Sequence, residues 1–247
     1  MGKVVAVASG KGGTGKTTTV AAVASCLAAL GHKTLCLDFD LELRNLDLAL
    51  CMADFTVADF MDVVTERLDL MEACHECPQI SNLFFLAAPV NFDPDKSGLP
   101  DVVPLFAKIR DEFDFCLVDC PSGVGPGFKL AHADADMSIV VTTSELPAMR
   151  DAQRTAEIVR DMGVGEVRLL VNRVVPGKIR WLHSTIDEII DTVGLQLIGL
   201  VPEDDVVFLS LHDNTPLVLY HKRRAAYDFL DVARRVAGEK VSLRQYR

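Results

Sequence analysis

Short, continuous apolar runs alternate along the chain with longer segments of mixed polarity. After the first run, Val20, Val23, Leu27 and Leu30 recur at spacings of three and four, as on one face of a helix. The short runs themselves are typical of parallel strands that are buried on both faces. They cover residues 4–8, 34–37, 83–87, 115–119, 138–142, 167–171 and 197–201.

Helical segments separate most of these strands. The pattern predicts helices over residues 19–30, 60–64, 101–113 and 148–161. Gly31 is expected to end the first, and a capping box from Thr56 to Asp59 is expected to start the second. The alternation predicts an α/β fold: a doubly wound, mostly parallel sheet of about seven strands with helices on both faces. The length of 247 residues fits a single domain, 1–247, with a tail at 238–247.

A glycine-rich loop lies between the first strand and the first helix. It meets the pattern G-x-x-x-x-G-K-[ST] with Gly10, Gly15, Lys16 and Thr17. Glycines let backbone N–H groups approach phosphate closely, and the following helix adds free N–H groups and the positive end of its dipole. The lysine supplies charge to the β- and γ-phosphates, and the threonine hydroxyl is the expected ligand of Mg²⁺. The sequence therefore predicts a nucleoside triphosphate site with Mg²⁺, formed by Gly10, Lys11, Gly12, Gly13, Thr14, Gly15, Lys16, Thr17 and Thr18.

Carboxylates follow two of the predicted strands. Asp38 and Asp40 come directly after the strand 34–37, and Asp119 ends the strand 115–119. Ligands bind at the carboxyl ends of strands in open α/β sheets, so all three should lie beside the glycine-rich loop. We expect Asp40 to orient the attacking water, and Asp38 and Asp119 to hold Mg²⁺ through water, with Thr17 as a direct ligand. The alternative is that Asp38 and Asp40 only cap an acidic loop.

Lys11 is a second lysine within the loop, in the string K-G-G-T-G-K-T, and a simple P-loop does not need it. The loop resembles that of the deviant Walker A ATPases, the family that includes MinD, ParA and the nitrogenase iron protein. The resemblance implies a P-loop NTPase fold of the SIMIBI type and a lysine that reaches the phosphates of the other subunit in a dimer. It makes Lys11, Lys16 and Asp40 the expected catalytic residues. The alternative for Lys11 is a solvated loop cation.

Later stretches resemble the same family. Residues 38–47 match the first switch segment of MinD-type members, D-F-D-x-x-L-R-N-L-D, but carry Glu42 where a glycine is expected. The string D-x-P-x-G resembles the second switch, in which the amide of Gly123 would sense the γ-phosphate. The guanine-reading motif N-K-x-D is absent, so the expected nucleotides are ATP and ADP. The residues that the resemblance places beside the adenine are Asn172, Arg173, Pro202 and Asp204.

The resemblance also implies how such a protein works. It would be a slow ATPase, stimulated by an activator protein, that forms a homodimer with ATP and releases it after hydrolysis to ADP and phosphate. MinD-type members act in division-site placement or related spatial positioning, in the cytoplasm and peripherally at the inner face of the cell membrane. Residues 238–247 have too narrow an apolar stripe for a helix on a membrane surface, so membrane association is expected to be weak or partner-assisted.

Two alternatives come from the same family. A ParA-type partition ATPase would bind DNA non-specifically through basic residues. The net charge of −10, from 25 basic and 35 acidic residues, disfavours DNA binding without excluding it. An iron–sulfur electron carrier would need cysteines that bridge two subunits, and the spacing of Cys74 and Cys77 does not match. The basic residues available to a DNA-binding surface are His221, Lys222, Arg223, Arg224, Arg234 and Arg235.

Cysteine usage and hydropathy limit the remaining classes. Seven scattered cysteines are typical of reduced cytosolic thiols. Cys74 and Cys77 form a C-x-x-C pair, but only Cys51 lies near as a further thiol, so we favour incidental cysteines over a four-ligand zinc site. No apolar run reaches the length of about 18 residues that a spanning helix needs. The start of the chain shows no signal-peptide pattern.

Overall fold

The computed structural model describes residues 1–41, 43–53, 58–90, 92, 98–175, 185–220 and 224–244. Within these ranges the strands are β1 (Lys3–Ala8), β2 (Thr34–Asp38), β3 (His75–Glu76), β4 (Leu83–Leu86), β5 (Phe115–Asp119), β6 (Met137–Thr142), β7 (Glu166–Val174) and β8 (Gln196–Pro202). They form one sheet of eight strands in the order β3-β4-β2-β5-β1-β6-β7-β8. Neighbours pair in parallel except for β3, which is antiparallel to β4. The predicted α/β fold is confirmed, with one strand more than expected.

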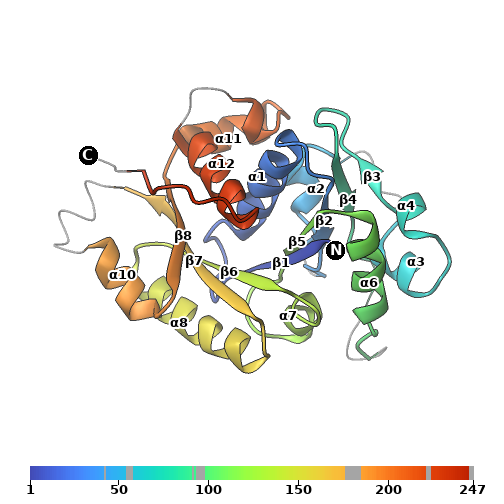
Figure 1. Ribbon diagram of the computed structural model, residues 1–247, viewed down its shortest axis with the longest axis horizontal. Coiled ribbons are helices and arrows are strands. Elements are labelled where there is room, and N and C mark those ends of the chain that lie inside the picture. The colour runs from blue at the N-terminus through green and yellow to red at the C-terminus, as the bar shows by residue number, and fades with distance from the viewer. Residues whose placement is uncertain are drawn as a thin grey trace.

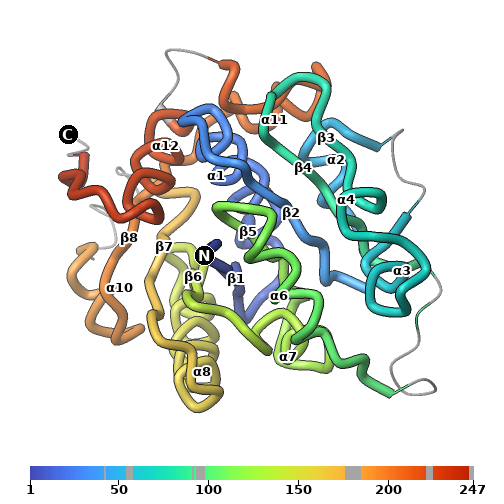
Figure 2. Tube along the Cα trace, turned by 45° about the vertical axis from the view of Figure 1, so that its right-hand side comes forward, coloured from blue at the N-terminus to red at the C-terminus, as the bar shows by residue number. Residues whose placement is uncertain are grey.

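Helices cover both faces of the sheet (Figure 1). One face carries α1 (Lys16–Ala29), α2 (Leu46–Ala49), α11 (Asp205–His212), η1 (Leu217–Leu219) and α12 (Arg224–Val236). The other carries α3 (Phe60–Val64), α4 (Leu70–Ala73), α6 (Val103–Glu112), α7 (Pro126–Ala131), α8 (Leu146–Asp161) and α10 (Ile186–Val193). The alternation of side chains along β1 explains the layers: Val5 and Val7 enter the core under α1, and Val4 and Ala6 enter the opposite core. In Figure 2, α12 lies beside α1, and the two helices are in contact.

The predicted elements differ from the structure mainly at their ends. The first helix begins at Lys16 rather than at residue 19, because the glycine-rich loop already delivers the chain into helical geometry. The helix α3 starts at residue 60 as predicted, but Asp59 is its N-cap, and the capping box closes with Asp62. Thr56, the expected first member of the box, lies outside the described residues. Short elements such as β3 and α4 were not predicted, since a few residues carry no readable periodicity. The longer helices α10, α11 and α12 were not predicted either.

The C-x-x-C pair flanks β3 at the edge of the sheet. Cys74 is buried in the core under α3, α4 and α6, and Cys77 is buried in the opposite core, which contains α1. The two thiols therefore lie on opposite faces of the sheet and cannot share one metal ion. Burial also raises the pKa of the Cys74 thiol to about 12. Among the described residues, no group of three or more His, Cys, Asp or Glu side chains could hold a metal ion.

The basic cluster near the end of the chain is partly engaged by the protein itself. Residues 221–223 lie outside the described ranges. Arg234 lies 3.9 Å from a carboxylate oxygen of Glu239, and Arg235 donates hydrogen bonds to the carbonyls of Ile198, Val241 and Ser242. The segment 239–244 that follows α12 forms no helix. No helix in the described part of the chain is long and apolar enough to cross a membrane.

Candidate active site

The glycine-rich loop joins the carboxyl end of β1 to the start of α1. Gly15, at φ 92°, is the N-cap of α1 and offers no side chain to the helix start. A Cβ there would lie 2.2 Å from Asn172 Nδ2, which donates a hydrogen bond to the Thr14 carbonyl oxygen at 2.9 Å. Gly10 is equally confined, because a Cβ on it would lie 2.5 Å from the Asp151 carbonyl oxygen. The loop is therefore fixed against β7 and α8, and the first N–H groups of α1 have no side-chain cap, an arrangement that suits an anion.

Lys16 is the buried cation of this loop. Lys16 is the first residue of α1, and it is only 7% exposed. The ammonium group donates a long hydrogen bond, 3.4 Å, to the hydroxyl of Ser122 in the segment after β5. A neutral hydroxyl balances a buried charge poorly, so the position of Lys16 favours a ligand with charged oxygens.

Two aspartates lie side by side at the ends of neighbouring strands. Asp38 ends β2 and Asp119 ends β5, and the two residues are partners in the parallel register. Both are 1% exposed. Burial raises the pKa of Asp38 to about 8, with the neighbouring charge of Asp119 as a further cause. Burial likewise raises the pKa of Asp119 to about 6, although a hydrogen bond from Thr17 and the charge of Lys16 oppose the rise.

The cluster of aspartates at this edge of the sheet is suited to a divalent cation. Asp119 Oδ1 is buried without a hydrogen-bond partner. Asp40 is also buried; its N–H donates to Asp38 Oδ1 at 2.8 Å, and its Oδ1 accepts from the Leu43 N–H at 3.1 Å. Mg²⁺ is held in proteins by one or two carboxylates, waters and substrate phosphates, so it does not need a group of three protein carboxylates. Thr17, Asp38 and Asp119 are the residues that would hold it, the aspartates through water.

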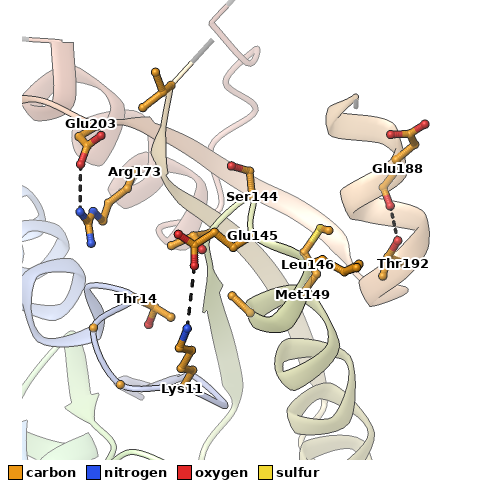
Figure 3. A pocket seen from close by; sticks show the side chains of 15 residues that line it. Lys11, Thr14, Ser144, Glu145, Leu146, Met149, Arg173, Glu188, Thr192 and Glu203 are labelled. Carbon is orange, nitrogen blue, oxygen red and sulfur yellow. Dashed lines mark hydrogen bonds and ion pairs between the residues drawn. The ribbon is translucent and has the colours of Figure 1, made fainter. Parts of the chain in front are cut away.

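A cavity of about 940 Å³ extends from the loop toward the ends of β6, β7 and β8. Figure 3 shows Lys11 pointing toward Glu145 from one side, and their charged atoms lie 3.9 Å apart. On the other side, Arg173 and Glu203 form an ion pair of 3.0 Å. Arg173 has a φ of 53°. It lies at an irregularity where two residues of β7, Asn172 and Arg173, stand opposite one residue of β8, and its side chain lines the cavity.

The remaining expected site residues lie close by, with local roles of their own. Asp204 caps α11, because its Oδ1 accepts the Val206 N–H at 3.0 Å, and Pro202 is buried at the end of β8. Gly123 has a φ of 82° and needs glycine for that reason. Sequence reasoning assigned no role to Ser122 or Glu145, and it placed Glu203 only within a loop expected beside the adenine. The one signal that the three share was a position just after the end of a parallel strand, which does not say where a side chain points.

Comparison with known proteins agrees with this geometry. The family model "CobQ/CobB/MinD/ParA nucleotide binding domain" matches residues 5–217. The septum site-determining protein MinD of Synechocystis sp. is 34% identical over 243 residues, which is 98% of this chain and 91% of that protein. MinD of Bacillus subtilis is 33% identical over 246 residues, with 98% and 92% covered.

Solved structures agree as well. The chain is similar to a structure of the MinC:MinD cell division protein complex of Aquifex aeolicus, with a TM-score of 0.89, 31% identity and 99% of each chain covered. It is also similar to MinD of Pyrococcus horikoshii complexed with Mg-ADP, with a TM-score of 0.83, 26% identity and 96% of each chain covered.

Proposed function

Because the chain belongs to the CobQ/CobB/MinD/ParA family of nucleotide-binding domains, we propose that it is a MinD-like ATPase, a switch that acts in division-site placement. The observation that carries the proposal is the meeting of Lys16, Asp38 and Asp119 beside a loop that suits phosphate. A buried cation with a weak hydrogen-bond partner is suited to bind the phosphates of ATP. Two buried carboxylates with raised pKa values are suited to bind Mg²⁺.

Each residue then has one task in hydrolysis. Lys16 holds the β- and γ-phosphates, and the loop N–H groups surround them. Thr17, Asp38 and Asp119 would hold the magnesium ion, the aspartates through water, and the bound ion would neutralise charge on the phosphate oxygens. Asp40 accepts a hydrogen bond from the attacking water and orients it, and phosphoryl transfer needs such positioning more than it needs a strong base. Asn172 and Arg173 face the adenine, because both lie at the end of β7 beside the loop.

Lys11 supports a homodimer in the ATP state. Its side chain is 49% exposed, and its ion pair with Glu145 is long and open to solvent. Such surface pairs contribute between nothing and about 1 kcal/mol, so Lys11 can leave Glu145 at little cost. Free of that pair, it extends to the phosphates of a second copy. Hydrolysis is slow until a partner protein completes the site, and it then releases the dimer.

The dimer is expected to act on a partner protein, a membrane surface or DNA. The relative from Aquifex was solved in complex with MinC, which supports a protein partner for this chain. We propose weak or partner-assisted association with the inner face of the membrane. Binding to DNA is disfavoured, because Arg234 and Arg235 are engaged by Glu239 and by backbone carbonyls.

The test is sizing of the protein with MgATP on an Asp40→Ala background, which should bind ATP without hydrolysing it. We expect a dimer with ATP and a monomer with ADP. Adding Lys16→Ala should abolish nucleotide binding, because the phosphates lose their main cation. Adding Lys11→Ala should preserve ATP binding and prevent the dimer. Lys108→Ala, an exposed lysine on α6, is the matched control and should change neither.

Unchanged ATP affinity in Lys16→Ala would overturn the site assignment, and a dimer in Lys11→Ala would overturn the role of that lysine. Co-sedimentation of the ATP-trapped protein with anionic liposomes and with DNA then separates the two surfaces. DNA binding that falls steeply with salt would favour the partition alternative.

A further inference from the structure

Ser122 is an exposed residue beside the phosphate-binding loop, and none of the expected roles falls on it. It lies in the segment after β5, between Asp119 and Gly123. Its hydroxyl accepts the hydrogen bond from Lys16 Nζ at 3.4 Å. The same oxygen lies 3.6 Å from the position that a Cβ on Gly12 would take. One hydroxyl from the second switch thus reaches both the lysine and a glycine of the phosphate-binding loop.

The contact with Lys16 is weak for a buried cation. N–H···O hydrogen bonds usually measure about 2.7–3.2 Å, and those between ionised groups are shorter and stronger. Phosphate oxygens would therefore replace the hydroxyl as the main partner of Lys16. In the protein without nucleotide, the hydroxyl of Ser122 is the hydrogen-bond partner of Lys16 that a phosphate oxygen would replace.

The hydroxyl can keep a partner after that exchange. A serine hydroxyl has one O–H to donate and two lone pairs that accept, whereas the ammonium of Lys16 only donates. When a phosphate oxygen accepts the hydrogen bond of Lys16 instead, the O–H of Ser122 can rotate and donate to the same oxygen. The next residue, Gly123, has a left-handed φ of 82°, and residues 122–125 belong to neither a strand nor a helix.

We propose that Ser122 is a positioning residue that selects ATP over ADP: its hydroxyl passes from Lys16 to the γ-phosphate when the triphosphate binds. ADP has no oxygen at that place, so the contact stabilises only the ATP state. The inference rests on the proposed ATPase function and names the side chain through which the second switch recognises the third phosphate.

The test compares the affinities of Ser122→Ala for Mg-ATPγS and Mg-ADP, measured by competition with a fluorescent nucleotide. Losing one hydrogen bond to a charged group should weaken Mg-ATPγS binding about tenfold. Mg-ADP affinity should stay within about twofold, and Ser122→Thr, which keeps the hydroxyl, should restore selectivity. The matched control is Ser81→Ala, an exposed serine in the turn between β3 and β4, which should leave both affinities unchanged.

Two results would overturn the proposal. Equal losses for both nucleotides would mean that Ser122 only supports the loop, and no loss for either would mean that its contact with Lys16 has no consequence. Lys16→Ala separates this failure from that of the proposed function. If Lys16→Ala abolishes binding and Ser122→Ala does not alter selectivity, the site stands and only the role of Ser122 falls.

Discussion

The two edges of the central sheet carry buried charge in opposite ways. At the carboxyl edge, Asp38 and Asp119 are buried side by side, and Asp119 Oδ1 has no hydrogen-bond partner. At the amino edge, Arg110 is 9% exposed, and its guanidinium contacts Asp134 Oδ2 at 3.1 Å and Asp136 Oδ2 at 2.5 Å. Burial works against the charge of Arg110, but the two carboxylates outweigh it and raise its pKa.

We propose that this difference separates groups that stabilise the fold from groups that bind a ligand. At the amino edge, Arg110 has two carboxylates and two backbone carbonyls as partners within the chain, so removing it would leave those groups without their donor. At the carboxyl edge, Asp38 accepts a hydrogen bond from a backbone N–H. Asp119 accepts one from Thr17 and interacts with the charge of Lys16. Neither carboxylate forms an ion pair among the described residues, and both pKa values are raised, so the folded protein without ligand bears a cost there. Metal ion and phosphate would relieve that cost, which couples ligand binding to stability. Raised pKa values at one edge and completed ion pairs at the other are the physical signs of these two roles.

The largest effect on stability should come from Arg110→Ala. Arg110 also donates hydrogen bonds to the carbonyls of Gly2 and Asp134, so it ties α6 to the start of β1 and to the turn before β6. Removing it should lower the free energy of unfolding by about 3 kcal/mol, because Asp134, Asp136 and two backbone carbonyls lose a charged hydrogen-bond donor. Urea unfolding measures the loss. The nucleotide affinity of the folded variant should not change.

The matched control for Arg110→Ala is Arg154→Ala, an exposed arginine on α8, which should change the free energy of unfolding by no more than about 0.5 kcal/mol. If Arg110→Ala were as stable as this control, the amino edge would not be the structural half of the comparison. A loss of nucleotide affinity in folded Arg110→Ala would show instead that the two edges are coupled.

Next in size is the pH dependence that Asp38 and Asp119 impose. Their folded-state pKa values, about 8 and about 6, lie above the unfolded value of about 3.9, so the folded state binds protons more tightly. The resulting stability is fully present below about pH 4 and is lost as the pH rises through 6 and 8. In EDTA, the free energy of unfolding should therefore fall between pH 6 and pH 8.5.

Asp38→Asn should reduce that slope and stabilise the metal-free protein at pH 8.5 by about 1–3 kcal/mol, because a buried charge is removed. Asp136→Asn, at the other edge, should destabilise and leave the slope unchanged, since Asp136 accepts from Arg110 and from the Val4 N–H at 2.7 Å. Urea curves at the two pH values measure both variants. If both substitutions changed the free energy of unfolding in the same direction, the contrast between the two edges of the sheet would be wrong.

Sequence reasoning reached the carboxyl edge better than the amino edge. The strands β2 and β5 are short apolar runs that end in aspartate, and parallel neighbours bring such ends together, so the meeting of Asp38 and Asp119 followed from order and polarity. The amino edge has no such signal. Arg110 and Asp136 lie on different elements, and only the packing of α6 against β1 and β5 brings them into contact.

The contacts of loop side chains could not be predicted from the sequence for a different reason. The direction of Ser122 or Glu145 depends on backbone angles in irregular segments, where no period of two or 3.6 residues applies. The C-x-x-C pair shows the same limit in reverse. Its spacing left a metal site open although incidental cysteines were favoured. The structure places Cys74 and Cys77, on either side of β3, in opposite cores, which becomes visible only once the segment is known to be a strand.

The smallest effect should come from Arg244, which fixes the segment 239–244 onto α12 above the amino edge. Its guanidinium contacts Asp231 Oδ2 at 2.6 Å and Oδ1 at 3.2 Å, and it lies over the ring of Tyr227. Because Arg244 is 46% exposed, Arg244→Ala should lower the free energy of unfolding by only about 1 kcal/mol. Its clearer effect should be local: faster hydrogen exchange of residues 239–244, measured by mass spectrometry.

Arg244→Lys should retain only part of that protection, because an ammonium group cannot bind both oxygens of Asp231 in the planar geometry of arginine. Lys240→Ala, an exposed lysine in the same segment, is the control and should leave exchange unchanged. Nucleotide affinity should remain as in the unmodified protein, since Arg244 belongs to the edge whose charges are already paired. If Arg244→Ala weakened ATP binding, the segment would be acting on the site through α12 and its neighbour α1, and the division of the sheet into a structural and a functional edge would be wrong.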